Sequence, residues 1–327
     1  MSSTTSTLEP PVTRPPAPAD ERFLFSGHQT FPLRISWLPK AADAISRGIN
    51  PFTDPRLGIQ VLGIGKNMVE SLRCWVELYG VARFDGPARQ PELTEFGQIV
   101  LGRKGCDPFL EDEQTLWLLH WNAATNPTRR FFAWHWVCNV HAEHEFSYDE
   151  ALRAFKAHAD TYARPLSNTT LHQHLDVFLG TYVQSSTPLS GVVAEDLLES
   201  PLSVLGFIRR GEPRPGSHGK DLTYTVDSGT KSGISDELFR FCLHDGWTQF
   251  ARDEITCSYR QIGHAINSPG RIFRLSEHDI HDRLQRLAVK WPKEFTLAES
   301  NNQRQLRRLP SAPKPAVLLR TIYEGTK

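Results

Sequence analysis

The sequence predicts a mainly α fold, built from tandem winged-helix or helix-turn-helix-like modules with small β-wings. Two observations predict it. Two short amphipathic segments near residue 60 are joined by a turn that contains two glycines, which is typical of a helix-turn-helix. Similar pairs of helical segments recur twice later in the chain, so three successive modules are expected.

The composition is that of an ordinary soluble protein, and 327 residues are enough for two or three domains. The formal net charge is +0, so a DNA-binding surface has to come from local segregation of charge. The five cysteines are widely separated, which favours reduced thiols in a cytoplasm. No apolar run approaches the ~18 residues that span a bilayer, so we expect a cytoplasmic protein without a membrane segment.

Composition and module positions together divide the chain into five parts. Residues 1–21 contain Ser, Thr and Pro with almost no apolar content, and a disordered tail is expected there. The other parts are an N-terminal winged-helix DNA-binding domain (22–106), a helical middle domain with a second helix-turn-helix-like unit (107–205), a Pro/Gly basic loop region (206–232) and a C-terminal winged-helix-like domain with a basic tail (233–327).

The first module is expected to begin with a helix from about Leu33 to Arg47. The side chains that would point inward are those of Ile35, Leu38, Ala42 and Ile45. A second helix, Pro55 to Leu62, precedes the turn formed by Gly63 and Gly65. In the third helix, one apolar face carries Val69, Leu72, Val76 and Tyr79. The opposite face is expected to present Lys66, Asn67, Glu70, Ser71 and Arg73.

A short hairpin is expected after the third helix, with its turn at 85–87, and it would be the wing of a winged helix. Arg83 and Arg89 would lie on this wing. In a helix-turn-helix the N-terminal residues of the second helix enter the major groove, and here they are Lys66 and Asn67. The alternative is two packed helices that never touch DNA. The predicted DNA-contact set is Lys66, Asn67, Arg73, Arg83, Arg89, Arg34 and Lys40.

Two residues near the N-terminus, His28 and Arg34, are the local candidates for catalysis, as an acid or base beside a phosphate clamp. The alternative is that His28 caps a turn and Arg34 pairs with a carboxylate. The start of a helix explains the acidic residues at 107–113, and a buried aromatic helix explains the histidines between 131 and 145. No metal site is assigned, and Mg²⁺ is expected only if DNA cleavage depends on a metal.

The two later modules give similar signals. Helices are expected over 148–159 and after the N-cap Ser167, with a neutral exposed face that favours a structural or dimerising role. The loop 211–220 either follows a phosphate backbone or only connects. In the third module, helices are expected over 234–244, over 258–266 and after a capping box of Ser276 and Asp279. The outer face of its last helix would carry Arg283, Gln285 and Arg286, and 295–309 would be a basic wing or tail.

Several runs of this sequence resemble one bacterial family. They are Phe25 to Arg34 (FSGHQTFPLR), Leu62 to Val69 (LGIGKNMV), Leu93-Thr-x-x-Gly97, and Asp107 to Asp112 followed by Thr115 to His120. The family is the SspB-like family, catalogued as a domain of unknown function, whose members accompany genes for DNA phosphorothioation. The resemblance covers nearly the whole chain after residue 22 and is strongest before Trp121.

The resemblance implies a DNA-binding component of a single-strand DNA phosphorothioation and phage-defence system, which nicks DNA to permit sulfur insertion. It also implies protein partners, namely a cysteine desulfurase, an ATPase and an ATP pyrophosphatase, and a homodimer is a further expectation. Gln29 stands where the family pattern leads us to expect an acid. The alternative function is that of a non-catalytic DNA-recognition subunit or transcriptional regulator.

Overall fold

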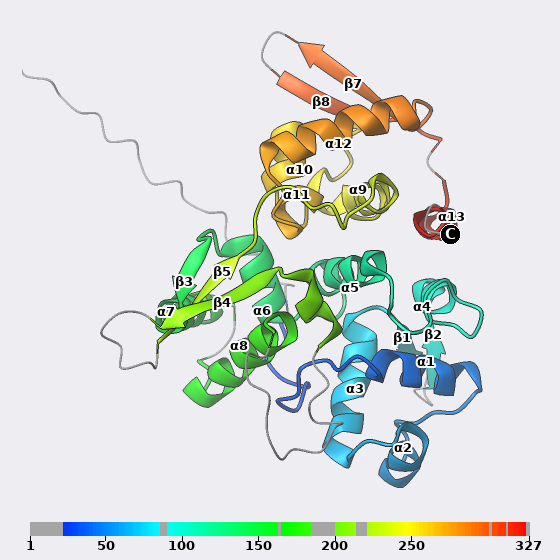
Figure 1. Ribbon diagram of the computed structural model, residues 1–327, viewed down its shortest axis with the longest axis vertical. Coiled ribbons are helices and arrows are strands. Elements are labelled where there is room, and N and C mark those ends of the chain that lie inside the picture. Colours follow the sequence, from blue (N-terminus) through cyan, green and yellow to red (C-terminus); the bar gives the residue numbers. More distant parts are fainter. Residues whose placement is uncertain are drawn as a thin grey trace, which may run out of the picture.

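The structure is a computed structural model that describes residues 22–85, 90–162, 165–184, 200–213, 221–300, 303–311 and 313–324. Helices predominate within these ranges, and the strands form three small antiparallel sheets (Figure 1). The fold is therefore mainly α with small β-sheets, as the sequence predicts. The predicted tail, 1–21, lies outside the described residues. No helix in the described part is long and apolar enough to cross a bilayer.

We call residues 22–106 the N-terminal unit. Its elements are α1 (Trp37–Ser46), α2 (Pro55–Leu62), α3 (Lys66–Leu78), β1 (Ala82–Asp85), β2 (Gln90–Leu93) and α4 (Glu95–Val100). The bounds of α2 are those predicted, because both of its ends are encoded locally. Asp54 caps its first turn by accepting the N–H of Arg56, and Pro55 follows at the first helical position. Gly63 ends it in the left-handed conformation, at φ 67°.

The first helix begins four residues later than predicted. α1 starts at Trp37, and Ile35, which was expected to point inward, is 39 % exposed. Pro39 explains the difference, because a proline lacks an N–H and is tolerated only within the first turn of a helix. A helix that started at Leu33 would place Pro39 in its second turn. The helix therefore starts two residues before the proline.

Residues 107–232 form the middle unit and residues 233–327 the C-terminal unit. The elements of the middle unit are α5 (Glu113–Thr125), α6 (Phe132–His135), the π-helix η1 (Trp136–Val140), β3 (Glu145–Ser147), α7 (Tyr148–Ala159), α8 (Asn168–Tyr182), the 3-10 helix η2 (Pro201–Leu205), β4 (Ile208–Pro213) and β5 (Leu222–Val226). Those of the C-terminal unit are α9 (Asp236–Phe250), β6 (Thr256–Ser258), α10 (Tyr259–His264), α11 (Pro269–Ile272), α12 (Glu277–Lys290), β7 (Phe295–Ser300), β8 (Gln303–Arg308) and α13 (Pro315–Ile322).

The middle and C-terminal units share one topology. In each, a short strand leads directly into a helix, further helices follow, and two strands complete a three-stranded sheet. The strand orders are β3-β5-β4 and β6-β8-β7, so the last strand is central in both sheets. Strands β3, β4, β5 and β6 were not predicted, and β4 and β5 lie in 206–232, where a loop region was expected. β3 and β6 have three residues each, and their pairing partners β5 and β8 lie far along the sequence.

The core is continuous through the three units, and α5 lies at its centre (Figure 1). His120 of α5 is fully buried, and each of its two ring nitrogens has a hydrogen-bond partner. Its Nδ1 lies 2.8 Å from the hydroxyl of Tyr182 on α8, and its Nε2 lies 3.0 Å from the carbonyl of Ile272 on α11. The C-terminal helix α13 packs against both α9 and α4, and Tyr323 hydrogen-bonds Thr115 of α5. The last helix therefore contacts all three units.

The outer face of α12 differs from the prediction at one position. Gln285 and Arg286 are exposed, but Arg283 is 3 % exposed. Its guanidinium donates to the carbonyls of Ile234 and Lys231 and lies 3.2 Å from Asp279. The carboxylate of Asp279 therefore faces Arg283. Of the predicted capping box, the bond from the Asp279 N–H to the Ser276 hydroxyl is present, and the reciprocal bond from the Asp279 side chain to the Ser276 N–H is not. The prediction of Arg283 as an outward residue was wrong, because it satisfies backbone carbonyls of a distant loop.

Candidate nucleic-acid interface

The N-terminal turn of α3 is the most exposed part of that helix. Gly65 is the N-cap and offers no side chain to the first amides of α3, and Lys66 and Asn67, which follow it, are both exposed. The predicted apolar face, which carries Val69, Leu72, Val76 and Tyr79, is buried. The first amides of the helix thus lack a side-chain cap beside a lysine and an asparagine.

The exposed face of α3 is narrower than predicted. Ser71 was expected on it but is fully buried, and its hydroxyl donates to the carbonyl of His28 at 2.8 Å. The helix is covered both by the rest of the N-terminal unit and by the middle unit, where Trp75 contacts Trp134 of α6. The polar residues of α3 that remain exposed or half-exposed are Lys66, Asn67, Glu70, Arg73 and Glu77.

A strained loop lies against this face. The φ angles of Gly27, Gln29 and Thr30 are 113°, 47° and 64°, and positive φ is rare for a β-branched residue such as Thr. Two hydrogen bonds hold the loop against α3. The side-chain amide of Gln29 donates to the carboxylate of Glu70 at 3.2 Å, and the backbone carbonyl of His28 accepts from the hydroxyl of Ser71. Gln29 and Thr30 are exposed. Backbone strain of this kind collects at functional sites.

His28 lies beneath the loop rather than on it. Its side chain is 3 % exposed, and its Nε2 lies 3.0 Å from Nδ1 of His174 on α8. His174 accepts the N–H of Ala133 at its Nε2, so a neutral His174 donates from Nδ1 to His28. Burial lowers the pKa of His28 to about 4. His28 thus lies in the interior, where it joins the loop to the middle unit, and the acid or base role stays a prediction.

Two further residues of the predicted DNA-contact set, Lys40 and Arg73, lie in different places near α3. Lys40 lies beside the glycine turn, since a Cβ at Gly63 would be 4.0 Å from its ammonium nitrogen. It therefore belongs with the N-terminal turn of α3. Arg73 lies over the ring of Phe84, 4.6 Å from its centroid, next to the β1–β2 hairpin.

Of the remaining predicted contacts, Arg83 lies on the same hairpin as Phe84. It pairs with Asp85 at 2.6 Å and with Glu92 at 3.2 Å, which offsets its charge. Arg34 is half-buried before α1, and Arg89 lies outside the described residues.

The side-chain contact between Gln29 and Glu70 was not predicted from the sequence. Their side chains meet although they are 41 positions apart, and no local periodicity connects a loop with a helix face at that distance. One signal was present in the sequence, namely the glutamine at a position where the family pattern leads us to expect an acid. With an acid at 29, two carboxylates would face each other across this contact.

Charge is segregated along the chain although the total is zero. Lys and Arg number 11 against 7 Asp and Glu over 22–106, 10 against 16 over 107–232, and 15 against 11 over 233–327. The N-terminal and C-terminal units are therefore basic and the middle unit is acidic. A polyanion would be attracted to the two ends of the chain and repelled by its middle.

The acidic cluster at 107–113 caps a helix. The carboxylate of Asp107 accepts the N–H groups of Glu111 and Asp112, and Asp112 accepts that of Gln114 at the start of α5. In the aromatic segment, Cys138 of η1 and His141, which directly follows η1, are buried. Among the described residues, no group of three or more His, Cys, Asp and Glu side chains is arranged to hold a metal ion.

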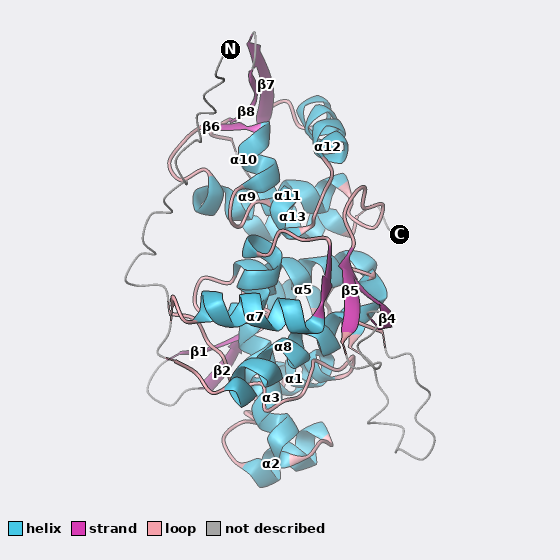
Figure 2. Ribbon diagram, turned by 90° about the vertical axis from the view of Figure 1, so that its left-hand side faces the viewer, coloured by secondary structure: helices cyan, strands magenta, loops and turns pink. Residues whose placement is uncertain are grey.

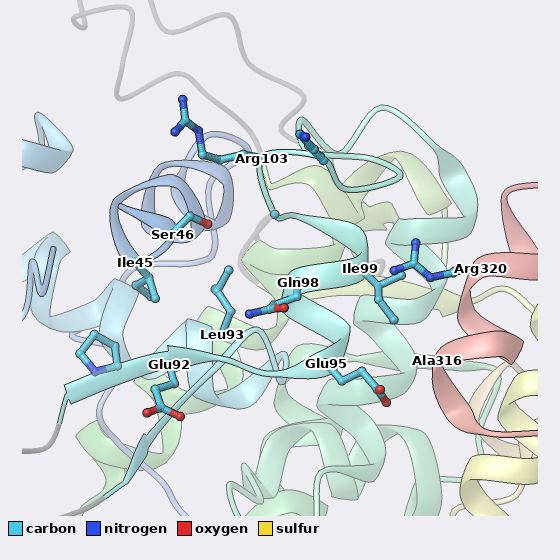
Figure 3. A pocket seen from close by; sticks show the side chains of 13 residues that line it. Ile45, Ser46, Glu92, Leu93, Glu95, Gln98, Ile99, Arg103, Ala316 and Arg320 are labelled. Atoms are coloured by element: carbon cyan, nitrogen blue, oxygen red, sulfur yellow. The ribbon is translucent and has the colours of Figure 1, made fainter. Parts of the chain in front are cut away.

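A cavity of about 810 Å³ opens elsewhere on the N-terminal unit, between α1, β2, α4 and α13 (Figure 3). Its floor is apolar, with Ile45, Leu93 and Ile99, and charges of both signs surround it, including Glu95 and Arg320. None of the predicted DNA-contact residues lines it. The candidate interface on α3 and the strained loop is thus separate from this cavity.

Comparisons with known proteins agree with this architecture. Two solved structures, the magnesium ion-bound SspB crystal structure and the SspB crystal structure, superpose with TM-scores of 0.73 and 0.72. Each is 23 % identical and covers 92 % of this chain and 86 % of its own, a likeness that establishes a common fold. No curated protein matches the chain. The family described as protein of unknown function (DUF4007) matches residues 25–323, and the chain therefore belongs to this family, which is SspB-like in fold.

Proposed function

We propose that this protein is the DNA-binding component of a DNA phosphorothioation system and that the N-terminal turn of α3 contacts the DNA. One observation carries the proposal, namely the exposure of Lys66 and Asn67 at a helix start without a side-chain cap, after a glycine turn. In a helix-turn-helix these positions meet bases and phosphates. Free amides and the positive end of the helix dipole favour phosphate at the same place.

The order of elements supports a winged-helix interpretation of the N-terminal unit. Three helices, α1 to α3, are followed by the antiparallel β1–β2 hairpin, which would be the wing. The strand orders of the middle and C-terminal units also suit winged helices. The middle unit is a structural module in this proposal, since the exposed face of α8 carries Asn168, Thr169, Gln173 and Asp176 and no cation.

The role in phosphorothioation rests on the family resemblance and on the shared fold with SspB. In this role the protein would act beside a cysteine desulfurase, an ATPase and an ATP pyrophosphatase. A DNA-recognition subunit without catalytic activity would use the same face of α3. The binding experiment below applies to both functions, and the nicking experiment separates them.

Replacing Lys66 by alanine should weaken duplex binding roughly tenfold at low salt, since a charge-assisted phosphate contact is lost. The slope of log K against log salt should also become shallower by about one phosphate contact. Fluorescence anisotropy of a labelled duplex at several salt concentrations measures both quantities.

The matched control is Lys156→Ala, because Lys156 is an exposed helix lysine on α7 of the acidic middle unit. Its affinity and salt slope should equal those of the wild type. Equal slopes for wild type and Lys66→Ala would remove Lys66 from the interface.

Strand nicking is the second part of the proposal, and we place it at the strained loop. Glu70 is an exposed carboxylate that accepts from the side-chain amide of Gln29, and carboxylate oxygens are ligands that Mg²⁺ accepts. One of the two similar SspB crystal structures is described as magnesium ion-bound, which supports a metal-dependent reaction. Glu70→Gln should lower Mg²⁺-dependent relaxation of a supercoiled plasmid roughly a hundredfold while duplex binding persists.

The control for this assay is Glu77→Gln on the same helix, where Glu77 pairs with Arg129 at 2.6 Å. It should nick like the wild type. Absence of plasmid relaxation by the wild type would reject nicking and leave the proposal of DNA binding intact.

A further inference from the structure

A second cluster of cationic side chains surrounds a cavity in the C-terminal unit, far from α3. The cavity has a volume of about 340 Å³ and lies between α10 and α12, beside the start of β8. The polar residues that line it are Tyr259, Arg260, His264, Glu277, His281 and Arg304. All but Glu277 carry hydrogen-bond donors, so the lining is suited to an anion.

The floor of this cavity depends on a close approach of two helices. A Cβ at Gly263 of α10 would lie 3.2 Å from Cδ1 of Ile280 on α12. A larger residue at 263 would press on Ile280 and move the helices apart. Gly263 therefore allows α10 and α12 to approach each other closely at the floor of the cavity. The space between their polar side chains stays open.

Arg260 and Arg304 supply the two guanidinium groups of the lining. Arg260 is exposed, and no hydrogen bond or ion pair joins it to another residue in the described part of the chain. Nη1 of Arg304 lies 3.2 Å from Nδ1 of His281. Because a guanidinium only donates, His281 accepts at Nδ1, and in its neutral form the proton is on Nε2.

The single carboxylate is a weak obstacle to an anion. Glu277 is 90 % exposed and lies 3.6 Å from His264, which is 51 % exposed. An exposed pair of this kind contributes little to stability. Glu277 can therefore turn into solvent when an anion enters, and His264 is then available to donate.

Phosphodiester is the anion that fits these donors and their surroundings. Arginine binds phosphate through parallel N–H groups. The unit carries the excess of cations given above, which attracts a polyanion rather than an isolated ion. Arg304 lines the cavity from β8. The β7–β8 hairpin projects from one end of the molecule (Figure 1).

We propose that this cavity binds a phosphate of the DNA backbone and that the protein holds two DNA segments at once. The inference rests on the proposed DNA binding by α3. Both views place α2 and the start of α3 at one end of the long axis and the β7–β8 hairpin at the other (Figures 1 and 2). A duplex bound at α3 therefore leaves the C-terminal cavity open to a second segment.

A bridging assay tests the proposal. One duplex is immobilised on beads, the full-length protein is added, and capture of a second, fluorescent duplex is measured. The wild type should capture it, and the double variant Arg260→Ala/Arg304→Ala should lose capture roughly tenfold or more, since two charge-assisted contacts are removed. The double variant should still bind the immobilised duplex through α3. Lys293→Ala, an exposed lysine beyond the other end of α12, is the control and should bridge normally.

The outcomes separate the two proposals. No binding of the wild type to either duplex would reject DNA binding itself. Binding to the beads without capture, or unchanged capture by the double variant, would overturn the second site, and unchanged capture would point to a dimer that binds through α3 alone. A thermal shift with inorganic phosphate that disappears in the double variant, without any bridging, would mark a site for small anions and would also overturn the proposal.

Discussion

Acidification from pH 7 to about pH 4 should unfold this protein cooperatively, because several histidines are buried as neutral groups. Burial lowers the pKa of His28, His120 and His141 to about 4 each, and it also lowers that of His174. In the unfolded chain a histidine titrates near 6.5. As the pH falls from 6.5 toward 4, these histidines therefore bind protons in the unfolded state but not in the folded state.

The sign of the effect follows from these lowered values. Above about pH 6.5 neither state is protonated at these sites, and the stability is complete. As the pH falls toward 4, each of the three sites costs on the order of 3 kcal/mol. Together they approach the whole stability of a typical folded protein, about 5 to 15 kcal/mol.

The tryptophan fluorescence and the far-UV circular dichroism should change together over this pH range. His120→Gln keeps hydrogen-bonding capacity without a titrating group. It should reduce the difference in unfolding free energy between pH 7 and pH 5 by on the order of 2 kcal/mol. His278→Gln is the control, because His278 is 83 % exposed on α12, and it should leave that difference unchanged. A stability independent of pH down to 4 would contradict the assignment of buried neutral histidines.

Removing Glu294 should destabilise the protein by on the order of 3 to 5 kcal/mol, because it would leave a buried arginine charge without a partner. Arg240 is 4 % exposed and Glu294 is 7 % exposed. Two hydrogen bonds of 2.8 and 2.6 Å join them, and His244 adds a third contact to Glu294 at 3.0 Å. Chemical denaturation of Glu294→Ala at pH 7, followed by tryptophan fluorescence, measures the loss.

An exposed ion pair nearby supplies the comparison. Glu237→Ala breaks a pair with Lys290, whose side chain is 50 % exposed, and should cost less than about 1 kcal/mol. The double variant Arg240→Met/Glu294→Leu should recover most of the loss of Glu294→Ala, because no charge remains buried. Equal losses for Glu294→Ala and Glu237→Ala would show that the buried charge is not the cause.

Features encoded by neighbouring residues could be predicted from the sequence. The bounds of α2, the glycine turn and the N-cap Ser167 all depend on contacts within about four positions, and the structure contains each of them. The start of α1 at Trp37 is also encoded locally, by Pro39, and the apolar periodicity alone does not reveal it. The predicted apolar face of α3 is buried for the same local reason.

Features that depend on distant partners could not be predicted. His28 is buried because α8 brings His174 to it from 146 positions away, and nothing in the local sequence reveals that contact. Arg283 resembles an outward helix residue by periodicity, yet loop carbonyls about 50 positions earlier bind it. One part of the candidate site could be predicted, namely Lys66 and Asn67 at an exposed helix start. The contact between Gln29 and Glu70 could not, because only the folded chain brings these residues together.

The position of α13 has a consequence for how the chain is completed during synthesis. The N-terminal unit is synthesised before α13, and the side of α4 that faces α13 has no covering helix until residues 315–322 emerge. The same holds for α9 and for the Thr115 hydroxyl that bonds Tyr323. A nascent chain that stalls before residue 315 therefore exposes apolar surface on units made much earlier. Complete burial of the N-terminal unit is reached only after residues 315–322 have left the ribosome.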